Sequence, residues 1–303
     1  MFPIETDELK RFLEDALAKG YVVPSKSPIA SFVFFIKKKD GKLRFVQDYQ
    51  KLNDITVKNH YPLPLAADII NKLQGAKIFT KFNVRWGYNS VRIKEGDKWK
   101  AAFVTNQGLF EPRVMYFGLC NSPATFQALM NHVFADLIAA GKVAVYLDDI
   151  LIWSNDIASH RKIVHKVLEH LAQYDLYLRP EKCKFERDEI EYLRLLIRKG
   201  QVGIDPAKVK AVTEWPTPKN LKDVRGFVEF ANFYCRFIKD FSKICRPLHD
   251  LTKKDTPFDW GSAQVDAFET LKRVFTTQPV LAMWNIDYTT RIETDASASA
   301  KSP

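Results

Sequence analysis

Residues 143–153 read VAVYLDDILIW, and this stretch predicts the hairpin on which the fold is built. Two carboxylates, Asp148 and Asp149, stand side by side between two short runs rich in β-branched and aromatic residues. Such runs predict two buried strands, so the acid pair falls at the turn between them. Adjacent anions against an apolar wall repel each other, and a divalent cation removes that penalty. Mg²⁺, a hard cation, is typically held by one or two carboxylates together with substrate phosphates.

An acid pair at a turn also has a simpler interpretation, a surface turn in which two acids happen to be adjacent. Asp tolerates turns, although the common two-residue hairpin turns use Asn-Gly or Asp-Gly. The residue before the pair, Leu147, follows Tyr146, and apolar runs flank the whole turn. This context favours a functional site, and the remainder of the chain has to decide between the two interpretations.

The composition of the chain limits the classes of protein to which it can belong. With 303 residues, 46% of them hydrophobic, it can bury a large core, and this length predicts two or more subdomains. A formal net charge of +10 favours a polyanionic partner. The four cysteines lack the spacing of a zinc site or a disulfide framework. We recognise no signal peptide and no apolar run long enough to cross a bilayer, so we expect an intracellular protein of the cytoplasm or nucleus, neither secreted nor bound to a membrane.

A second predicted hairpin precedes the acid pair and is strongly basic. Residues 31–36 and 43–49 read as its strands, and residues 37–42, KKKDGK, form the turn. Four lysines at the tip and the nearby Arg44 suit contacts with a triphosphate or a nucleic-acid backbone. A solvated turn is the alternative, because lysines are mostly exposed in folded proteins.

Periodicity and capping signals predict helices and strands along the rest of the chain. Ser122 followed by Pro123 predicts a helix that is capped by Ser122 and ends at Gly141. The apolar stripe of this helix is interpreted as core rather than as a binding surface. The sequence further predicts helices over residues 6–19, 159–174, 221–237 and 262–275, and strands over residues 77–84, up to Ile93, and over residues 192–197.

Several motifs surround the acid pair in a fixed order along the chain. They are IKKKDGKLRFVQDYQKLND (36–54), HYPLP (60–64), FGLCNSPATFQ (117–127), LRPEKCKF (178–185) and ANFYCRFI (231–238). Together with VYLDDILIWS (145–154), they resemble the reverse transcriptase region in the Pol polyprotein of LTR retrotransposons of the gypsy class, in a fungal-like form. The resemblance covers nearly the whole chain, and RIETDAS (291–297) resembles the first strand of a ribonuclease H domain.

The resemblance implies an α+β fold of the right-hand polymerase type, with fingers, a palm of antiparallel sheet and helices, a thumb, and a mostly helical connection segment. It assigns residues 1–178 to the fingers and palm, 179–214 to the end of the palm and start of the thumb, 215–289 to the thumb and connection, and 290–303 to a truncated ribonuclease H-like start. The implied activity is that of an RNA-directed DNA polymerase, which transfers nucleotides with two Mg²⁺ ions or with Mn²⁺ in their place. The implied partners are an RNA or DNA template with a DNA primer, and deoxynucleoside triphosphates.

The resemblance also assigns roles residue by residue. Asp148 and Asp149 match the metal-binding carboxylates, with the backbone of Val84 as a further metal ligand. Lys38 and Arg44 match the residues that hold the incoming triphosphate. The remaining matches are Tyr88 on the 2′ side of the sugar, Phe117 and Gly118 along the nucleotide pocket, and Leu193 and Arg194 in the strand that resembles the primer grip.

One departure from the family pattern falls on the metal site. The strand that ends in the family's third metal carboxylate reads KFN here, so Asn83 stands where Asp is expected. An amide offers one neutral oxygen and no charge, so we expect weaker metal binding and impaired catalysis. Arg194 also replaces a Gly, and Gln50 an Arg, and single transition mutations account for these changes, as in a decaying element copy.

Three interpretations of function stay open at this point. The first is a reverse transcriptase fragment whose activity is impaired at Asn83. The second is a non-catalytic nucleic-acid-binding remnant that keeps the fold and a basic cleft. The third is the inactive product of a pseudogene, against which the retention of Asp148, Asp149 and Arg44 argues.

Overall fold

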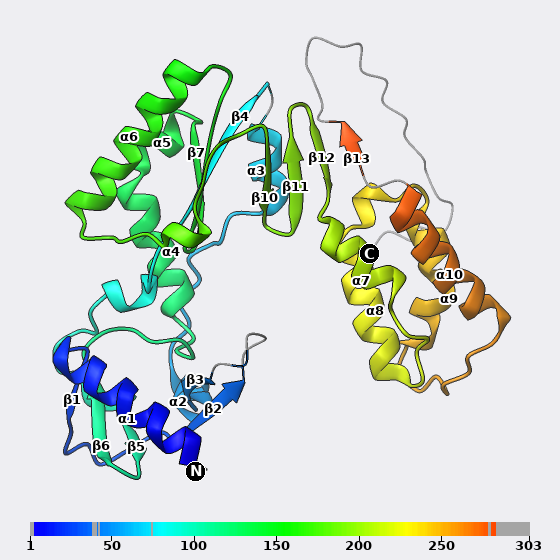
Figure 1. Cartoon of the computed structure of the whole chain (residues 1–303). Coiled ribbons are helices and arrows are strands. Elements are labelled where there is room, and N and C mark those ends of the chain that lie inside the picture. The colour runs from blue at the N-terminus through cyan, green and yellow to red at the C-terminus, as the bar shows by residue number, and fades with distance from the viewer. Residues whose placement is uncertain (1–2, 38–40, 42, 74, 278–279, 283–303) are drawn as a thin grey trace. The chain divides into compact units, whose positions relative to one another are not determined.

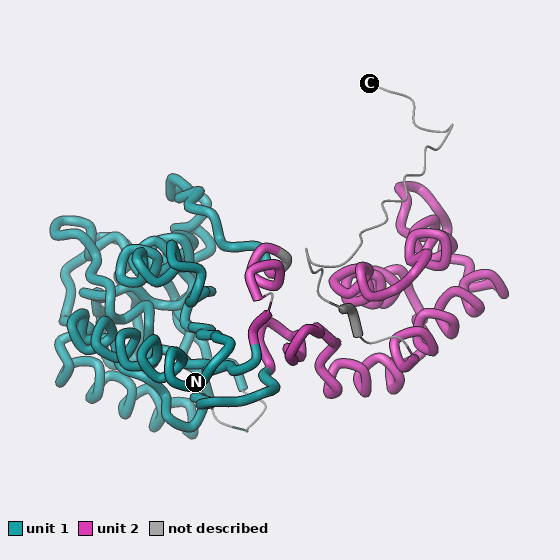
Figure 2. The backbone as a smooth tube through the Cα atoms, turned by 90° about the horizontal axis from the view of Figure 1, so that it is seen from above, with its two compact units in different colours: residues 1–65, 77–190 teal, residues 66–76, 191–303 magenta. Residues whose placement is uncertain are grey.

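The computed structural model describes residues 3–37, 41, 43–73, 75–277 and 280–282. The chain forms two compact units, drawn in teal and magenta in Figure 2. The first unit contains residues 1–65 and 77–190, and the second contains residues 66–76 and 191–303. Lys38 and the predicted ribonuclease H-like start at residues 290–303 lie outside the described residues.

The centre of the first unit is a four-stranded antiparallel sheet in the order β7-β8-β4-β9. The predicted hairpin around the acid pair is confirmed, because β7 and β8 pair from Val143↔Ile152 to Tyr146↔Asp149. On the other side of β8, the pairing with β4 ends at Asn83↔Asp149. The strands are β4 (Ile78–Asn83), β7 (Val143–Tyr146), β8 (Asp149–Ser154) and β9 (Lys184–Arg187).

Three helices pack on this sheet, α4 (Ser122–Val133), α5 (Ala135–Ala139) and α6 (Ile157–Gln173), as Figure 1 shows beside β7. Their apolar faces bury side chains such as Phe126 and Val167 against the strands. Each fully buried side chain of this size contributes roughly 1.5–3 kcal/mol, so this core holds the hairpin rigidly.

The predicted cap of α4 is wrong by one residue, and the predicted helix up to Gly141 is interrupted, because α4 ends at Val133 and a separate helix, α5, spans Ala135–Ala139. Asn121 occupies the N-cap position, and its side chain makes no capping hydrogen bond. The Asn121 amide instead donates to Val57 O at 2.9 Å, and the Ser122 hydroxyl donates to Tyr116 O at 3.1 Å. Both side chains therefore bond the loop before α4 to neighbouring segments and do not cap the first backbone amides of the helix.

The rest of the first unit contains two small sheets and helix α1. The predicted basic hairpin is observed as β2 paired with β3, although the tip at 38–40 and 42 lies outside the described residues. The predicted strand up to Ile93 is wrong, because residues 87–90 form a 3₁₀ turn and only Arg92 makes an isolated bridge, to Val114. The elements are α1 (Pro3–Ala18), β1 (Val22–Pro24), β2 (Val33–Lys37), β3 (Leu43–Gln47), α2 (Gln50–Ile55), β5 (Phe103–Thr105) and β6 (Gly108–Pro112).

The second unit joins a four-stranded sheet, in the order β10-β11-β12-β13, to a group of helices around an aromatic core. Phe227, Phe268 and Phe275 are each at most 1% exposed, so the helices pack mainly through aromatic side chains. The elements are α3 (Ala66–Lys72), β10 (Glu189–Tyr192), β11 (Leu195–Arg198), β12 (Gln201–Ile204), α7 (Pro206–Thr213), α8 (Leu221–Phe233), α9 (Phe241–Leu251), α10 (Ser262–Thr277) and β13 (Val280–Ala282).

Two predictions for the second unit need correction. Residues 192–197 form no single strand, because β10 and β11 are separate strands joined by a turn at Leu193 and Arg194. The predicted helix over residues 221–237 ends at Phe233, and a 3₁₀ turn follows over Cys235–Phe237. Within the described part of the chain, no helix combines the length and the apolar character that crossing a membrane requires.

Candidate active site

The turn between β7 and β8 is held by a residue that the sequence analysis did not single out, Gln127 of α4. Its side chain is fully buried, and its Oε1 accepts a hydrogen bond from Leu147 N at 2.8 Å. Its Nε2 donates to Val145 O at 3.0 Å and to Asn131 Oδ1 at 2.8 Å. Leu147 has a φ of +52°, a strained value for a branched side chain, which the Gln127 bracket helps to hold.

A signal for Gln127 is present in the sequence. It is a polar residue in the middle of the apolar stripe formed by Phe126, Met130 and Val133, which the sequence analysis treated as core. A polar group at a core-facing position must find hydrogen-bond partners, because burying it without them costs free energy. Here those partners are the backbone groups on either side of Tyr146, so the turn and the helix are fixed together.

The end of β4 brings Asn83 between the two acids. Asn83 Nδ2 donates to Asp148 Oδ2 at 3.0 Å and to Asp149 Oδ1 at 3.0 Å. The backbone nitrogen of Val84 donates to Asp148 O at 2.7 Å, which fixes the turn against β4. The Asn83 side chain is buried, and its Oδ1 has no hydrogen-bond partner among the described residues. One amide group therefore links both carboxylates and leaves its own oxygen unsatisfied.

The local charge is partly balanced by Lys81, which lies two residues before Asn83 on the same face of β4. Its Nζ is 3.3 Å from Asp149 Oδ1. Two carboxylates and one ammonium leave a net charge of −1 at this cluster. Among the described residues, no group of three or more His, Cys, Asp and Glu side chains is arranged to hold a metal ion.

A row of aromatic side chains leads away from the acid pair. The ring centroids of Tyr88 and Phe117 are 4.7 Å apart, and those of Tyr88 and Phe126 are 5.7 Å apart. Burial, followed by the nearby charge of Asp148, raises the pKa of the Tyr88 hydroxyl, so the hydroxyl stays protonated. The guanidinium carbon of Arg44 lies 4.6 Å from the centroid of the Phe117 ring, which is half exposed. Arg44, Phe117 and Tyr88 thus form a continuous row of contacts, and the charge of Asp148 acts on the Tyr88 hydroxyl at its end.

Gly118 has a structural reason for being glycine. Its φ is +102°, and a Cβ at this position would lie 3.3 Å from Gln47 O and 3.3 Å from Tyr49 Cδ2. A side chain would therefore be strained and would press on the end of the basic hairpin.

The two residues matched to the primer grip, Leu193 and Arg194, belong to the second unit, whereas the acid pair belongs to the first. They form the turn of the β10–β11 hairpin with φ values of +49° and +65°. Tyr234 Oη donates to Arg194 O at 3.2 Å, and the Arg194 guanidinium carbon is 5.7 Å from the Phe233 ring centroid. Their role in holding a primer stays a prediction.

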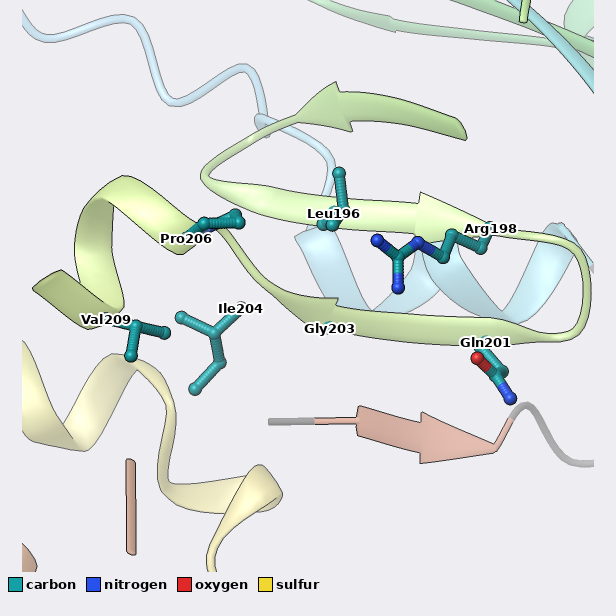
Figure 3. Close-up of a pocket in the computed structure, with 7 residues that line it drawn as sticks. All are labelled: Leu196, Arg198, Gln201, Gly203, Ile204, Pro206 and Val209. Atoms are coloured by element: carbon teal, nitrogen blue, oxygen red, sulfur yellow. The ribbon is translucent and has the colours of Figure 1, made fainter. Parts of the chain in front are cut away.

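A small cavity of about 260 Å³ in the second unit carries no carboxylate, so it is no candidate for a metal site. It lies against the β11–β12 hairpin and the start of α7 (Figure 3). Its lining consists of Leu196, Arg198, Gln201, Gly203, Ile204, Pro206 and Val209.

The sequence matches a known family and curated relatives. The profile described as "Reverse transcriptase (RNA-dependent DNA polymerase)" matches residues 36–196. The Transposon Tf2-3 polyprotein of Schizosaccharomyces pombe (strain 972 / ATCC 24843) is 35% identical over 287 residues, which make up 94% of this chain and 21% of that polyprotein. The Transposon Tf2-7 polyprotein of the same organism is 34% identical over the same share of both chains. This chain therefore spans about a fifth of the length of these relatives.

Solved structures with the same fold come from a foamy virus. Its protease-reverse transcriptase in complex with dsDNA has a TM-score of 0.84 at 22% identity, over 93% of this chain and 59% of that chain. The same viral protein in complex with an RNA/DNA hybrid has a TM-score of 0.81 at 21% identity, over 92% of this chain and 38% of that chain. At this identity the similarity supports the fold alone, and it confirms the predicted right-hand polymerase fold.

The family match begins at Ile36, so it includes the end of β2, the whole of β3, the acid pair and the turn at Leu193 and Arg194. It covers more than half of the chain, and the transposon relatives extend the match to almost all of it. The predicted resemblance to the reverse transcriptase region of a retrotransposon is confirmed by these relatives. The chain belongs to the reverse transcriptase (RNA-dependent DNA polymerase) family.

Proposed function

We propose that this chain is the RNA-directed DNA polymerase segment of a retrotransposon polyprotein and that it acts by two-metal nucleotidyl transfer. The observation that carries the proposal is the convergence of Asp148 and Asp149 on the Asn83 side chain, in a chain of the reverse transcriptase family. The proposed substrates are an RNA or DNA template with a DNA primer, and deoxynucleoside triphosphates. Complexes of the foamy viral protein with dsDNA and with an RNA/DNA hybrid support this choice of partners.

The donors at the acid pair fit Mg²⁺, or Mn²⁺ in its place. Asp148 Oδ2 and Asp149 Oδ1 accept hydrogen bonds from one nitrogen, so two anionic oxygens converge on one point. Carboxylates and backbone carbonyls are the ligands that hard cations prefer, so Asp148, Asp149 and the Val84 carbonyl would hold the metal. When bound, the divalent cations activate the primer 3′-hydroxyl and stabilise the pyrophosphate leaving group.

The residues around the acids bind and orient the substrates in this proposal. Arg44, with Lys38 on the same hairpin, holds the triphosphate by charge. The Tyr88 ring closes the 2′ side of the sugar pocket and so favours deoxyribose. Phe117 stacks beside the nucleotide, and Gly118 allows the backbone to approach it closely.

The amide of Asn83 weakens this site in two ways. It replaces a negative ligand with a neutral oxygen, which lowers the attraction for a divalent cation. A cation between Asp148 and Asp149 must also displace the two hydrogen bonds that the amide donates to them. Lewis-acid stabilisation is worth several kcal/mol, so its partial loss slows nucleotidyl transfer by roughly a thousandfold or more.

Primer extension tests both the polymerase activity and the effect of Asn83. The chain and its Asn83→Asp variant are compared on a homopolymeric RNA template annealed to a DNA primer, first in Mg²⁺ and then in Mn²⁺. We expect Asn83→Asp to extend the primer at least about a thousandfold faster in Mg²⁺, because the third carboxylate restores a negative ligand. A variant carrying both Asn83→Asp and Asp149→Asn is the matched control, and it should not show the faster primer extension of Asn83→Asp.

Two outcomes of this experiment contradict parts of the proposal. Equal primer extension by the chain and by Asn83→Asp means that the amide is an adequate metal ligand. The predicted impairment of catalysis at Asn83 is then wrong. Extension by neither protein in either metal, while the template-primer duplex still binds, overturns the polymerase proposal. That second result supports a chain that only binds nucleic acid.

The second candidate function is a non-catalytic nucleic-acid-binding protein. One observation favours it, because the Asn83 amide donates to both Asp148 and Asp149 and so occupies the carboxylate oxygens that would face a metal. The net charge of +10 still attracts a polyanion. The inactive product of a pseudogene is the third candidate, and it differs by failing to bind the duplex at all.

The subdomain assignment and the location in the cell are also part of this proposal. We assign residues 1–178 to fingers and palm, 179–214 to the end of the palm and start of the thumb, and 215–289 to thumb and connection. The predominance of helices after Pro206 supports the last assignment. The turn at Leu193 and Arg194 would contact the primer, and the substrates place the activity inside the cell, in the cytoplasm or nucleus.

A further inference from the structure

We propose that the first unit holds a second phosphate-binding site, a cationic cleft that takes the phosphates of a nucleotide next to an aromatic base. The cleft has a volume of about 700 Å³ and lies where the chain leaves α1, β4, β6 and α6. The proposal does not depend on polymerase activity. The residues of the cleft that carry the argument are Lys19, Arg85, Trp86, Arg92, Arg113 and Tyr177.

The charges of the cleft favour an anion. Four cationic side chains line it, and one carboxylate, Asp175, opposes them. Within the described residues, Arg85, Arg92 and Arg113 make no ion pair with a carboxylate, whereas Lys19 pairs with Asp15 at 2.6 Å. Three guanidinium groups are thus left without an anionic partner. Guanidinium groups bind phosphate oxygens through paired hydrogen bonds, so they suit phosphate better than other anions.

Arg113 interacts electrostatically with one carboxylate, Glu95, which already has another partner. The hydrogen bond and the ion pair of Glu95 are with Lys98. The Arg113 guanidinium therefore remains available to a ligand in the cleft. An exposed arginine can also be merely solvated, whereas a binding site holds its cations in place.

Trp86 supplies such a feature at the centre of the cleft. The Lys19 Nζ lies 4.1 Å and the Arg85 guanidinium carbon 4.0 Å from the Trp86 ring centroid. Both cations are thereby positioned by cation–π attraction, so less side-chain entropy is lost when a ligand binds. Trp86 itself has a φ of +52°, and the Arg85 backbone nitrogen donates to Tyr177 O at 2.6 Å. Two loops are thus fixed to each other at the cations.

The aromatic rings at the edge of the cleft favour a ligand with a base. Tyr177 is 69% exposed and Tyr174 is 40% exposed, so both side chains are partly open to solvent. Bases stack on such rings with little regard to sequence. The volume also falls within the roughly 300–1,000 Å³ of sites for small ligands. Phosphates next to a base are found in a free nucleotide and in a single-stranded nucleic acid, and the experiment separates these two sources.

A neighbouring cavity extends the cationic lining towards the acid pair. It has a volume of about 480 Å³, shares Arg85 and Trp86 with the cleft, and adds Arg179, Pro180 and one carboxylate, Glu181. The Arg179 backbone nitrogen donates to Asn83 O at 2.9 Å, so this extension adjoins the end of β4. None of the residues matched to the nucleotide pocket, Arg44, Tyr88, Phe117 and Gly118, lines either cavity. The proposed site is therefore distinct from that pocket.

The test measures binding of two fluorescent probes by anisotropy, with EDTA present to remove divalent cations. One probe is a fluorescent ATP analogue, and the other is a labelled ten-nucleotide oligothymidylate. The cleft variant is Arg92→Gln with Arg113→Gln, which leaves the Trp86 contacts intact. The matched control, Arg11→Gln with Arg187→Gln, changes the net charge equally at two exposed arginines of the same unit outside both cavities.

We expect the cleft variant to weaken binding of at least one probe by about tenfold or more, the effect of losing two phosphate contacts, and the control to stay within about twofold. Loss confined to the ATP analogue identifies a free nucleotide as the ligand, and loss confined to the oligonucleotide identifies a single strand. Equal weakening by the cleft variant and the control overturns the proposal, because the binding is then general charge attraction. Unchanged binding in the cleft variant, or binding of neither probe, overturns it as well.

A second pair of variants tests the base-binding side of the cleft. Tyr177→Ala removes the exposed ring, and Tyr177→Phe keeps it. Stacking of a base on one ring is worth about 1–3 kcal/mol. Tyr177→Ala should therefore lower the affinity for the probe that binds by about fivefold or more, and Tyr177→Phe should leave this affinity unchanged. Equal affinities in these two variants overturn the stacking part of the proposal.

Discussion

Asn83 keeps the shape of the aspartate it replaces and changes one atom from acceptor to donor. The sequence alone predicts that this position lacks a negative charge. It does not predict that the amide donates to both acids, because that depends on the pairing Asn83↔Asp149 and on the turn that aims Asp148. The buried Oδ1 without a partner carries a cost of about 1–3 kcal/mol, offset by two charge-assisted hydrogen bonds.

Arg194 gives a prediction at the scale of one residue. It has a φ of +65° in the turn after β10, where the family pattern has glycine. Left-handed backbone costs a residue with a Cβ roughly 1–2 kcal/mol, and glycine loses about 0.5–1 kcal/mol more entropy on folding. Arg194→Gly should therefore raise the free energy of unfolding of the second unit by about 0.5–1 kcal/mol, measured by urea denaturation of the full chain.

Arg194→Ala separates backbone strain from the loss of the arginine side chain. Alanine keeps the Cβ, so it should bring no gain, and it loses only the distant contact with the Phe233 ring. If alanine stabilises the chain as much as glycine, the strain argument is wrong and the arginine side chain itself is unfavourable. If glycine destabilises the chain, the positive φ carries no cost in this turn.

The turn at Leu193 and Arg194 also explains why the strand predicted over residues 192–197 is wrong. Two-residue hairpin turns with positive φ usually contain Asn or Gly, and Leu193–Arg194 contains neither, so the segment resembles one strand. Helix α9 was missed for a related reason, because Pro247 in its interior reads as a helix breaker. By contrast, the β7–β8 hairpin was predictable, since continuous apolar runs rich in β-branched residues flank the acid pair on both sides, and both strands are buried along almost their whole length.

His160 of α6 connects the two central strands of the first unit and gives a prediction at the scale of elements. It is fully buried, with Nε2 2.7 Å from Thr80 Oγ1 of β4 and Nδ1 3.0 Å from Ser154 Oγ of β8. Thr80 Oγ1 already accepts from Glu186 N, and the Ser154 hydroxyl already donates to Asp156 O. The network therefore assigns the proton of a neutral ring to Nδ1.

Protonation of Nε2 would make it a donor towards Thr80 Oγ1, so the Thr80 hydroxyl proton would lose the acceptor it has in the neutral ring. Burial lowers the pKa of His160 below its ordinary value of 6.5, against the opposing charges of Glu186 and Asp156. The unfolded chain then binds the proton more readily than the folded chain, so stability is full above pH 6.5 and is lost as the pH falls towards the folded pKa.

We expect the free energy of unfolding to decrease between pH 7.5 and pH 5, with His160 contributing at most about 1.4 kcal/mol per pH unit, the limit for one proton. Urea denaturation of the chain, of His160→Gln and of His165→Gln across this range measures the effect. His160→Gln should have a lower free energy of unfolding at pH 7.5, and that free energy should change less with pH. His165→Gln, at an exposed position of the same helix, is the matched control for replacing a histidine. Equal slopes in all three proteins would contradict the assignment.

At the scale of the whole molecule, the sequence predicted more than one subdomain but not which segments combine. Residues 66–76 belong to the second unit, although residues on both sides of them belong to the first. Ile70 of α3 packs against the same core as Phe227 and Leu248. Those partners lie more than a hundred residues further along the chain, and no local periodicity can specify such a contact. The positive charge, in contrast, is a property of the whole chain and needs no fold to predict it.

The charge leads to a prediction about duplex binding. A net charge of +10 should draw the chain to nucleic acid mainly through the phosphate backbone, with counterion release on binding. In EDTA, the logarithm of the association constant for an RNA/DNA template-primer should fall linearly with the logarithm of salt concentration. With about five phosphates contacted, the slope should be about −4 to −5, measured by anisotropy over 50–400 mM KCl. A dsDNA duplex should give a similar slope, because backbone contacts carry no sequence information.

Asn83→Asp is the control that separates binding from catalysis in this experiment. Its slope should match that of the parent chain, because position 83 is buried beside the acids and contacts no phosphate in a metal-free duplex complex. A slope near zero would show that the duplex is not held by its phosphates, and it would remove the charge argument from both binding functions. A linear salt dependence without primer extension, even in Asn83→Asp, would identify the chain as a non-catalytic nucleic-acid-binding protein. The basic surface would then bind the duplex, while the restored carboxylate would not produce catalysis.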